Sequence, residues 1–186
     1  MAGITSGPIA ILAGSGELPG RLADRLAATG RPHRILAFRG FCDGALRTRA
    51  DAVLGLLDVR AIEAQLRAWQ PAAVTLAGGL HRPSAAALAD AFSALRDREE
   101  IVALAARGDD NLLRGAADLL ESRGFPLLGI RDLAPDLLAR PGQHGLCRPS
   151  ARNEAAIATG FRLLAELSPF DVGQAAVLDG ARVLAV

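Results

Sequence analysis

The sequence predicts an α/β fold in which a parallel sheet is flanked by helices and followed by the start of a second domain. The first observation is a set of short apolar runs typical of strands buried on both faces, at residues 8–13, 34–38, 52–54, 72–77 and 125–130. The second is that a helical apolar pattern follows most of these runs, an alternation that indicates a parallel sheet. The third is size, because 186 residues, 51% of them apolar, can bury a substantial core.

Proline and glycine mark the ends of the first predicted helix. Pro19 opens it, Leu22 and Leu26 share one face, and Gly30 ends it. A second helix is predicted over residues 59–69, where the apolar residues again form one stripe. These helices alternate with the strands, so the unit is expected to be Rossmann-like.

Further helices are predicted after the fourth strand. Ser84 can cap an alanine-rich helix, and a helical pattern continues over residues 96–107. Asp109 opens another helix that Gly124 ends, and the run at 125–130 then supplies a fifth strand. Residues 1–139 are therefore interpreted as one Rossmann-like domain.

A connector separates this domain from the carboxyl-terminal part of the chain. Residues 140–150 are rich in proline and glycine and show no periodicity, which is typical of a linker. Residues 151–186 predict one helix and two strands joined by Asp179 and Gly180, a favoured hairpin turn. Since a single hairpin is not stable alone, we expect this segment to be the start of a truncated carboxyl-terminal domain.

The composition excludes several functions. All 21 basic residues are arginine, so there is no lysine for a Schiff base or for a P-loop. The net charge of +1 and the absence of a basic stripe argue against nucleic acid as a partner. Cys42 and Cys147 form no metal or disulfide pattern, which favours the cytoplasm. With no signal peptide and no apolar run of roughly 20 residues, we expect at most peripheral contact with a membrane.

The first candidate site is the glycine-rich loop after the first strand. Small residues there let the backbone approach a phosphate, and the amides at the following helix start face the same place. The alternative is a tight strand-to-helix turn whose glycines serve only backbone geometry. The candidate binding residues of this loop are Gly14, Ser15, Gly16, Leu18 and Pro19.

The second candidate loop follows the fourth strand, at the same carboxyl edge of the predicted sheet. Its candidate residues are Gly79, Leu80, His81 and Arg82. His81 and Arg82 suit a phosphate or a sugar hydroxyl, although a solvated histidine and arginine would look the same in sequence. The convergence of two loops favours a binding pocket.

Asp109 and Asp110 are candidates for a metal or for a ribose, but two acids at a helix start also cap the helix and favour its dipole. No nucleophile elbow, zinc motif or paired catalytic acids are present. We therefore predict no catalytic residue and leave the metal ligands unknown.

An NADP-dependent oxidoreductase domain is an alternative. The second strand does not end in the acidic residue that hydrogen-bonds the ribose of NAD, and Arg39 follows this strand instead. Arg39 can meet a 2′-phosphate, or it is an ordinary loop arginine. A non-catalytic nucleotide-sugar binding module is a third hypothesis.

Four segments in register resemble the LpxI-type UDP-2,3-diacylglucosamine pyrophosphatases. They are AGSGELP at 13–19, AGGLHRP at 77–83, GDDNLLR at 108–114 and DVGQAAV at 171–177. The resemblance covers nearly the whole chain and adds Gln174 to the candidate binding residues. It carries over no catalytic residue, since the essential aspartate of the family belongs to a stretch beyond Val186.

The resemblance implies hydrolysis of UDP-2,3-diacylglucosamine to 2,3-diacylglucosamine 1-phosphate (lipid X) and UMP in lipid A biosynthesis, with a divalent cation such as Mg²⁺. It implies that this chain is the amino-terminal, substrate-binding part of the enzyme and is inactive by itself. The cation ligands are then expected outside this chain. A cytoplasmic location, peripheral contact with the inner membrane and a homo-oligomer complete these expectations.

Overall fold

The computed structural model describes residues 7–80, 109–170 and 172–186, and of residues 109–114 it describes the backbone. The predicted helices over residues 84–107 lie outside the described residues. Contacts within the chain define two units, residues 1–106 with 113–139 and residues 107–112 with 140–186.

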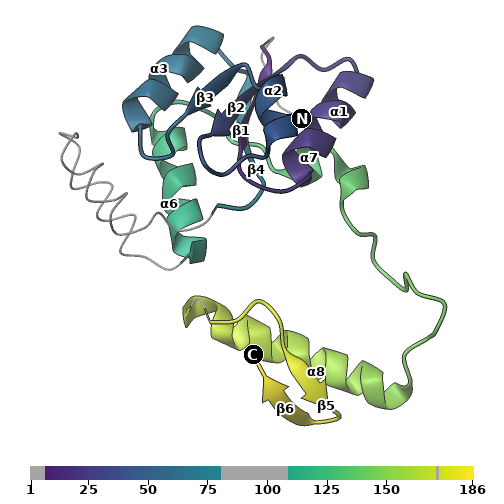
Figure 1. The fold of residues 1–186 in the computed structure, drawn as a ribbon. Helices are drawn as coiled ribbons and strands as arrows, with labels where there is room; N and C mark the ends of the chain where they lie inside the picture. Colours follow the sequence, from purple (N-terminus) through teal and green to yellow (C-terminus); the bar gives the residue numbers. More distant parts are fainter. Residues whose placement is uncertain (1–6, 81–108, 171) are drawn as a thin grey trace. The chain divides into compact units, whose positions relative to one another are not determined.

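The first unit is built on a parallel sheet. Its strands are β1 (Ile9–Ala13), β2 (His33–Phe38), β3 (Ala52–Leu54) and β4 (Ala73–Ala77), in the order β3-β2-β1-β4 (Figure 1). Ile9 pairs with His33 on one side and with Ala73 on the other. Every residue of β1 is buried, as expected for a strand covered on both faces. The α/β class and the first four predicted strands are confirmed.

Helices cover both faces of this sheet. One face packs on α1 (Leu18–Ala28), α2 (Gly44–Arg49) and α7 (Ile130–Leu133), with the 3-10 turn η1 (Pro135–Leu137) beside α7. The other packs on α3 (Val59–Trp69) and α6 (Asp109–Ser122). Alternate strand residues divide between the two cores, so that Ile11 and Ile35 face α1 whereas Leu12 and Leu36 face α3.

Capping residues set the helix starts. The side chain of Asp43 accepts a hydrogen bond of 2.7 Å from Leu46 N and starts α2, and Asp58 accepts from Ala61 N at 3.2 Å and starts α3. Helix α1 has Pro19 in its first turn and is followed by Gly30 at φ +66°. The predicted helices near 19–30 and 59–69 are thus confirmed, while the short α2 was not predicted.

The fifth predicted strand, at residues 125–130, is wrong as a full strand. The segment forms a single parallel bridge between Val74 and Leu127, with hydrogen bonds from Val74 N to Pro126 O and from Leu128 N to Val74 O. Pro126 has no N–H to extend the ladder. Asp132 then accepts a hydrogen bond from Gly129 N, which fixes the start of α7 at Ile130.

Thr75 places a hydroxyl in the core of this sheet. The residue has 0% exposure, and its Oγ1 has no hydrogen-bond partner among the described residues. We expect Thr75→Val to raise the free energy of unfolding by about 1 kcal/mol, because it removes a buried polar group without changing the side-chain shape. Urea denaturation measures this change. Thr48→Val is the control and should give no gain, since the Thr48 hydroxyl is exposed and donates to Ala45 O. A less stable Thr75→Val protein would contradict the prediction.

A cluster of charges ties α3 to the end of α6. The Glu63 carboxylate accepts hydrogen bonds from Arg67 Nη2, at 2.7 Å, and from Arg123. Arg67 also lies over the Phe125 ring, 5.4 Å from its centroid. Hydrogen bonding from Arg67, and then from Arg123, holds the pKa of Glu63 below its ordinary value of 4.5.

This cluster predicts a pH-dependent contribution to stability. Because the folded-state pKa of Glu63 is below the unfolded value, the contribution is present above the unfolded pKa and is lost as the pH falls through the folded pKa. Glu63→Gln should lower the free energy of unfolding by roughly 1 kcal/mol at neutral pH and by less at about pH 3. Urea denaturation at both pH values checks this.

Glu17→Gln is the control for Glu63→Gln, since Glu17 also pairs with an arginine four residues later but is 79% exposed. Its effect should stay below about 0.5 kcal/mol at either pH. If Glu63→Gln lowered the free energy of unfolding equally at both pH values, the role assigned to the carboxylate charge would be contradicted.

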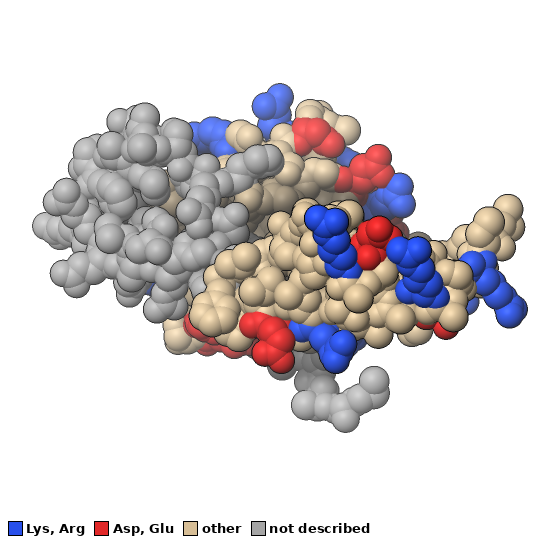
Figure 2. Space-filling model, turned by 90° about the horizontal axis from the view of Figure 1, so that it is seen from below, with Lys and Arg blue, Asp and Glu red and all other residues tan. Residues whose placement is uncertain are grey.

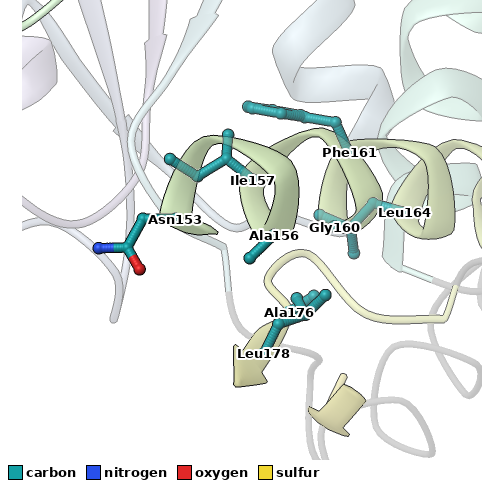
Figure 3. A pocket seen from close by; sticks show the side chains of 8 residues that line it. All are labelled: Asn153, Ala156, Ile157, Gly160, Phe161, Leu164, Ala176 and Leu178. Atoms are coloured by element: carbon teal, nitrogen blue, oxygen red, sulfur yellow. The ribbon is translucent and has the colours of Figure 1, made fainter. Parts of the chain in front are cut away.

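The second unit contains α8 (Ala151–Leu167), the 3-10 turn η2 (Ser168–Phe170) and a hairpin of β5 (Val177–Asp179) and β6 (Arg182–Ala185). Ser150 caps α8 by accepting from Asn153 N, and Gly180 turns the hairpin at φ +58°. The predicted helix and hairpin are confirmed. Buried Gly160 lets Leu178 pack against α8, since a Cβ there would lie 3.1 Å from Leu178 Cδ1 (Figure 3).

Charges of both signs are distributed over one face of the described residues (Figure 2). On the face in Figure 2, arginines and acidic side chains are interspersed, without a continuous basic area. In the described ranges, none of the helices has the length and apolar content needed to cross a bilayer.

Candidate functional site

The strand order places two loops at one point of the sheet edge. The chain leaves β1 for α1 and β2 on one side, and it returns through α3 to β4 on the other side of β1. In an open parallel sheet, ligands bind at the carboxyl edge where the strand order reverses in this way. The loops that follow β1 and β4 flank this point.

Hydrogen bonds join the two loops directly. Ser15 N donates to Gly79 O at 2.8 Å, and Gly79 N donates to Ser15 O at 2.9 Å. The Ser15 hydroxyl donates to the same Gly79 oxygen at 2.9 Å, and Gly14 N donates to Ala77 O at 2.9 Å. The convergence predicted from sequence is therefore present, for the described part of the second loop.

The glycines of these loops have different roles. A Cβ on Gly14 would collide with the carbonyl of Gly79. Gly78 has φ +90°, and a Cβ there would lie 2.5 Å from Ser15 O and 2.9 Å from the Pro19 ring. Gly16 also has a positive φ, +87°, but none of the described residues has an atom within 4 Å of its Cβ position. Gly14 and Gly78 thus permit contact between the loops, whereas Gly16 leaves open space.

The start of α1 supplies the polar groups of this space. Glu17 is the N-cap residue of α1, but its side chain accepts no hydrogen bond from the amides of the first turn. Leu18 is 37% exposed beside them, and Pro19 is buried. Glu17 pairs with Arg21 at 2.7 Å, which balances the one carboxylate at this helix start. Amides in this arrangement can donate hydrogen bonds to phosphate oxygens, and the helix dipole favours an anion at the same place.

Other predicted site residues are placed less completely. His81 and Arg82 lie outside the described residues. Asp109 and Asp110 are the first residues of α6, as predicted, and the structure describes their backbone. Gln174 is exposed before β5 and belongs to the second unit, whereas both loops belong to the first.

The donors of a metal site are not gathered in the described ranges. Within them, no three His, Cys, Asp or Glu side chains are grouped so as to hold a metal ion.

The second unit has an open groove of about 520 Å³ beside α8. Ile157, Phe161 and Leu178 are among its lining residues, and Asn153 is its polar member (Figure 3). The described lining residues of this groove carry no ionisable side chain.

One residue of the site was missed from sequence. Gly78 is required where the loops cross, because it combines a positive φ with close contacts to Ser15 and Pro19. The signal was the pair of adjacent glycines after the fourth strand, of which only Gly79 was selected. Two consecutive glycines at a strand end indicate a turn whose backbone conformation or close contacts exclude a side chain.

Two comparisons with known proteins agree. A family model described as the LpxI N-terminal domain matches residues 8–137. The UDP-2,3-diacylglucosamine pyrophosphatase LpxI of Caulobacter vibrioides is 31% identical over 178 residues, which cover 96% of this chain and 64% of that protein. The chain thus spans less than two thirds of the length of this curated relative.

Proposed function

This chain belongs to the LpxI family, and we propose that it supplies the substrate-binding part of an enzyme that hydrolyses UDP-2,3-diacylglucosamine to 2,3-diacylglucosamine 1-phosphate and UMP. Lipid A biosynthesis is the proposed pathway. The observation that carries the proposal is the pair of hydrogen-bonded loops at the switch point of the sheet, beside the start of α1. The curated relative is named a UDP-2,3-diacylglucosamine pyrophosphatase, which supports the proposal.

The proposed binding surface places the phosphates of the substrate at the open side of Gly16. Backbone amides at the start of α1 would bind and orient phosphate oxygens there, and they need no reorganisation to do so. Gly14, Ser15, Pro19, Gly79 and Leu80 would shape the surface, with Leu18 at its exposed rim. His81, Arg82, Asp109, Asp110 and Gln174 remain proposed members.

A divalent cation such as Mg²⁺ is part of the proposal because the resemblance implies it. Such an ion would neutralise charge that develops on the phosphate oxygens. In the described ranges, no donor set fits a metal ion, so we assign no ligand and derive no step through the cation. The residues of the proposed surface would bind and orient the nucleotide.

The NADP-dependent oxidoreductase is not favoured. At the end of β2, Arg39 is exposed and its backbone N donates to Leu54 O, which agrees with an ordinary loop arginine. A non-catalytic nucleotide-sugar module would use the same binding surface, and only a hydrolysis assay separates it from the enzyme.

The remaining expectations are also proposals. We propose domains at residues 1–139 and 151–186 joined by a linker at 140–150, and a cytoplasmic protein that contacts the inner membrane peripherally. Contact with the membrane would agree with a diacylated substrate. Self-association into a homo-oligomer completes the proposal.

Titration of this chain with UMP, followed by amide NMR, tests the proposed surface. UMP should shift the resonances of Gly16 and Leu18, and NADPH should not. Gly16→Ala should weaken UMP binding at least tenfold, since the new Cβ fills the open side of the loop and strains the positive φ.

Gly124→Ala is the matched control for Gly16→Ala, because Gly124 has the same φ of +87° and, like Gly16, no described atom within 4 Å of its Cβ position, but lies after α6. It should bind UMP like the wild type. Absence of UMP binding, or shifts produced by NADPH alone, would reject the proposal. Release of UMP from UDP-2,3-diacylglucosamine by a protein with the full length of the relative would distinguish an enzyme from a binding module.

A further inference from the structure

Ser15 uses both of its hydrogen-bond donors on one partner. Its backbone N–H and its hydroxyl each donate to Gly79 O, at 2.8 and 2.9 Å. A carbonyl oxygen has two lone pairs, so these two bonds satisfy it fully. A third bond, from Gly79 N to Ser15 O, completes an isolated antiparallel bridge between residues 64 positions apart.

Steric contacts make the same pairing specific. A Cβ on Gly79 would lie 2.9 Å from Ser15 Oγ, which is the atom of the described residues that comes within 4 Å of this position. The serine hydroxyl therefore occupies the space that a side chain at residue 79 would need. A side chain at residue 79 would displace the Ser15 hydroxyl from its bond to Gly79 O, whereas Gly79 is not among the glycines with a positive φ.

The bridge also places Leu80 over the first loop. Leu80 Cδ2 lies 3.1 Å from the Cβ position of Gly14, and the Leu80 side chain packs on the core beside α3. The position of Leu80 follows from that of Gly79, which Ser15 holds. The position of the second loop thus depends on its contacts with the first loop.

We infer that Ser15 is a positioning residue, which couples the two loops, and that its hydroxyl is not a substrate ligand. The inference rests on the proposed function, in which both loops bind one nucleotide. A loop that is already held in place loses less entropy when the ligand binds. Loss of the hydroxyl should therefore weaken binding although the hydroxyl makes no contact with the ligand.

Four variants test this inference with UMP as the probe. Isothermal titration calorimetry should give about fivefold weaker binding for Ser15→Ala, the effect of one typical hydrogen bond, and nearly wild-type binding for Ser15→Thr, which keeps a hydroxyl. Gly79→Ala should bind at least tenfold more weakly. The double variant Ser15→Ala, Gly79→Ala should bind better than Gly79→Ala, because removal of Oγ makes room for the new methyl group.

Hydrogen exchange of the Gly79 amide provides a readout without ligand. Exchange should be about fivefold faster in Ser15→Ala and unchanged in Ser15→Thr. Ser122→Ala is the matched control, since the Ser122 hydroxyl donates to a carbonyl only three residues away in α6, at 2.8 Å. It should change neither UMP binding nor the exchange of Gly79.

The outcomes separate this inference from the proposed function. If wild-type protein binds UMP and Ser15→Ala binds equally well, the positioning role is overturned while the proposed surface stands. If wild-type protein does not bind UMP, the proposed function fails, and faster Gly79 exchange in Ser15→Ala still supports the coupling of the loops. Unchanged exchange in that case would overturn the coupling as well.

Discussion

Gly78→Ala is expected to lower the free energy of unfolding by about 3–5 kcal/mol and to abolish UMP binding. The residue has φ +90°, which strains any side chain, and its Cβ would lie 2.5 Å from Ser15 O and 2.9 Å from Pro19 Cγ. Backbone atoms and a proline ring cannot move aside as a flexible side chain can. The clash therefore adds to the strain of the positive φ.

Gly16→Ala separates these two contributions. Gly16 has nearly the same φ, +87°, but no described atom within 4 Å of its Cβ position, so its substitution should cost only about 1–2 kcal/mol in stability. Urea denaturation of both variants, at equal protein concentration, measures the difference. Equal losses of stability would show that the contact between the loops contributes nothing beyond backbone strain.

The sheet could be predicted from the sequence because its signal is local. Each residue of β1 is apolar and buried, and the helices after the strands carry their own start and stop signals, such as Pro19 and Gly30. A strand buried on both faces tolerates few polar residues, so it can be recognised in the sequence as a continuous run of apolar residues. The same reasoning located both loops, since the carboxyl ends of parallel strands lie at one edge.

The exceptions depend on single residues within an apolar pattern. The run at 125–130 has the hydrophobicity of a strand, but Pro126 removes a ladder donor, and the Asp132 carboxylate ends the extended segment by accepting from Gly129 N. Helix α2 was missed because its six residues bury only Leu46. A period of 3.6 residues cannot be recognised in so short a segment.

The roles of the site residues could not be predicted, because they depend on pairs distant in sequence. Spacing made Gly14 and Gly16 equivalent members of one motif, yet the first contacts Gly79 and the second faces open space. Ser15 had the features of a phosphate ligand, and its hydroxyl instead donates to a residue 64 positions later. Contacts of this kind are visible only in three dimensions.

The start of α1 should depend on how firmly this helix is held against the sheet. Leu22 is fully buried, in the core with Ile9, Ile11 and Ile35. Leu22→Ala is expected to lower the free energy of unfolding by about 2–5 kcal/mol, because it leaves a cavity between α1 and β1. We also expect weaker UMP binding at temperatures where the variant stays folded, since the amides proposed to bind phosphate belong to the first turn of α1.

Leu18→Ala is the control for this prediction, as it makes the same substitution in the same helix at a residue that is 37% exposed. Its stability should fall by less than about 1 kcal/mol. The two variants, compared by urea denaturation and by UMP titration, separate the docking of α1 from contact at the rim of the site. If Leu22→Ala lost stability but kept wild-type affinity, the amides would be positioned by the bridge between the loops and not by the packing of α1. If Leu18→Ala lost affinity without losing stability, the Leu18 side chain would contact the nucleotide itself.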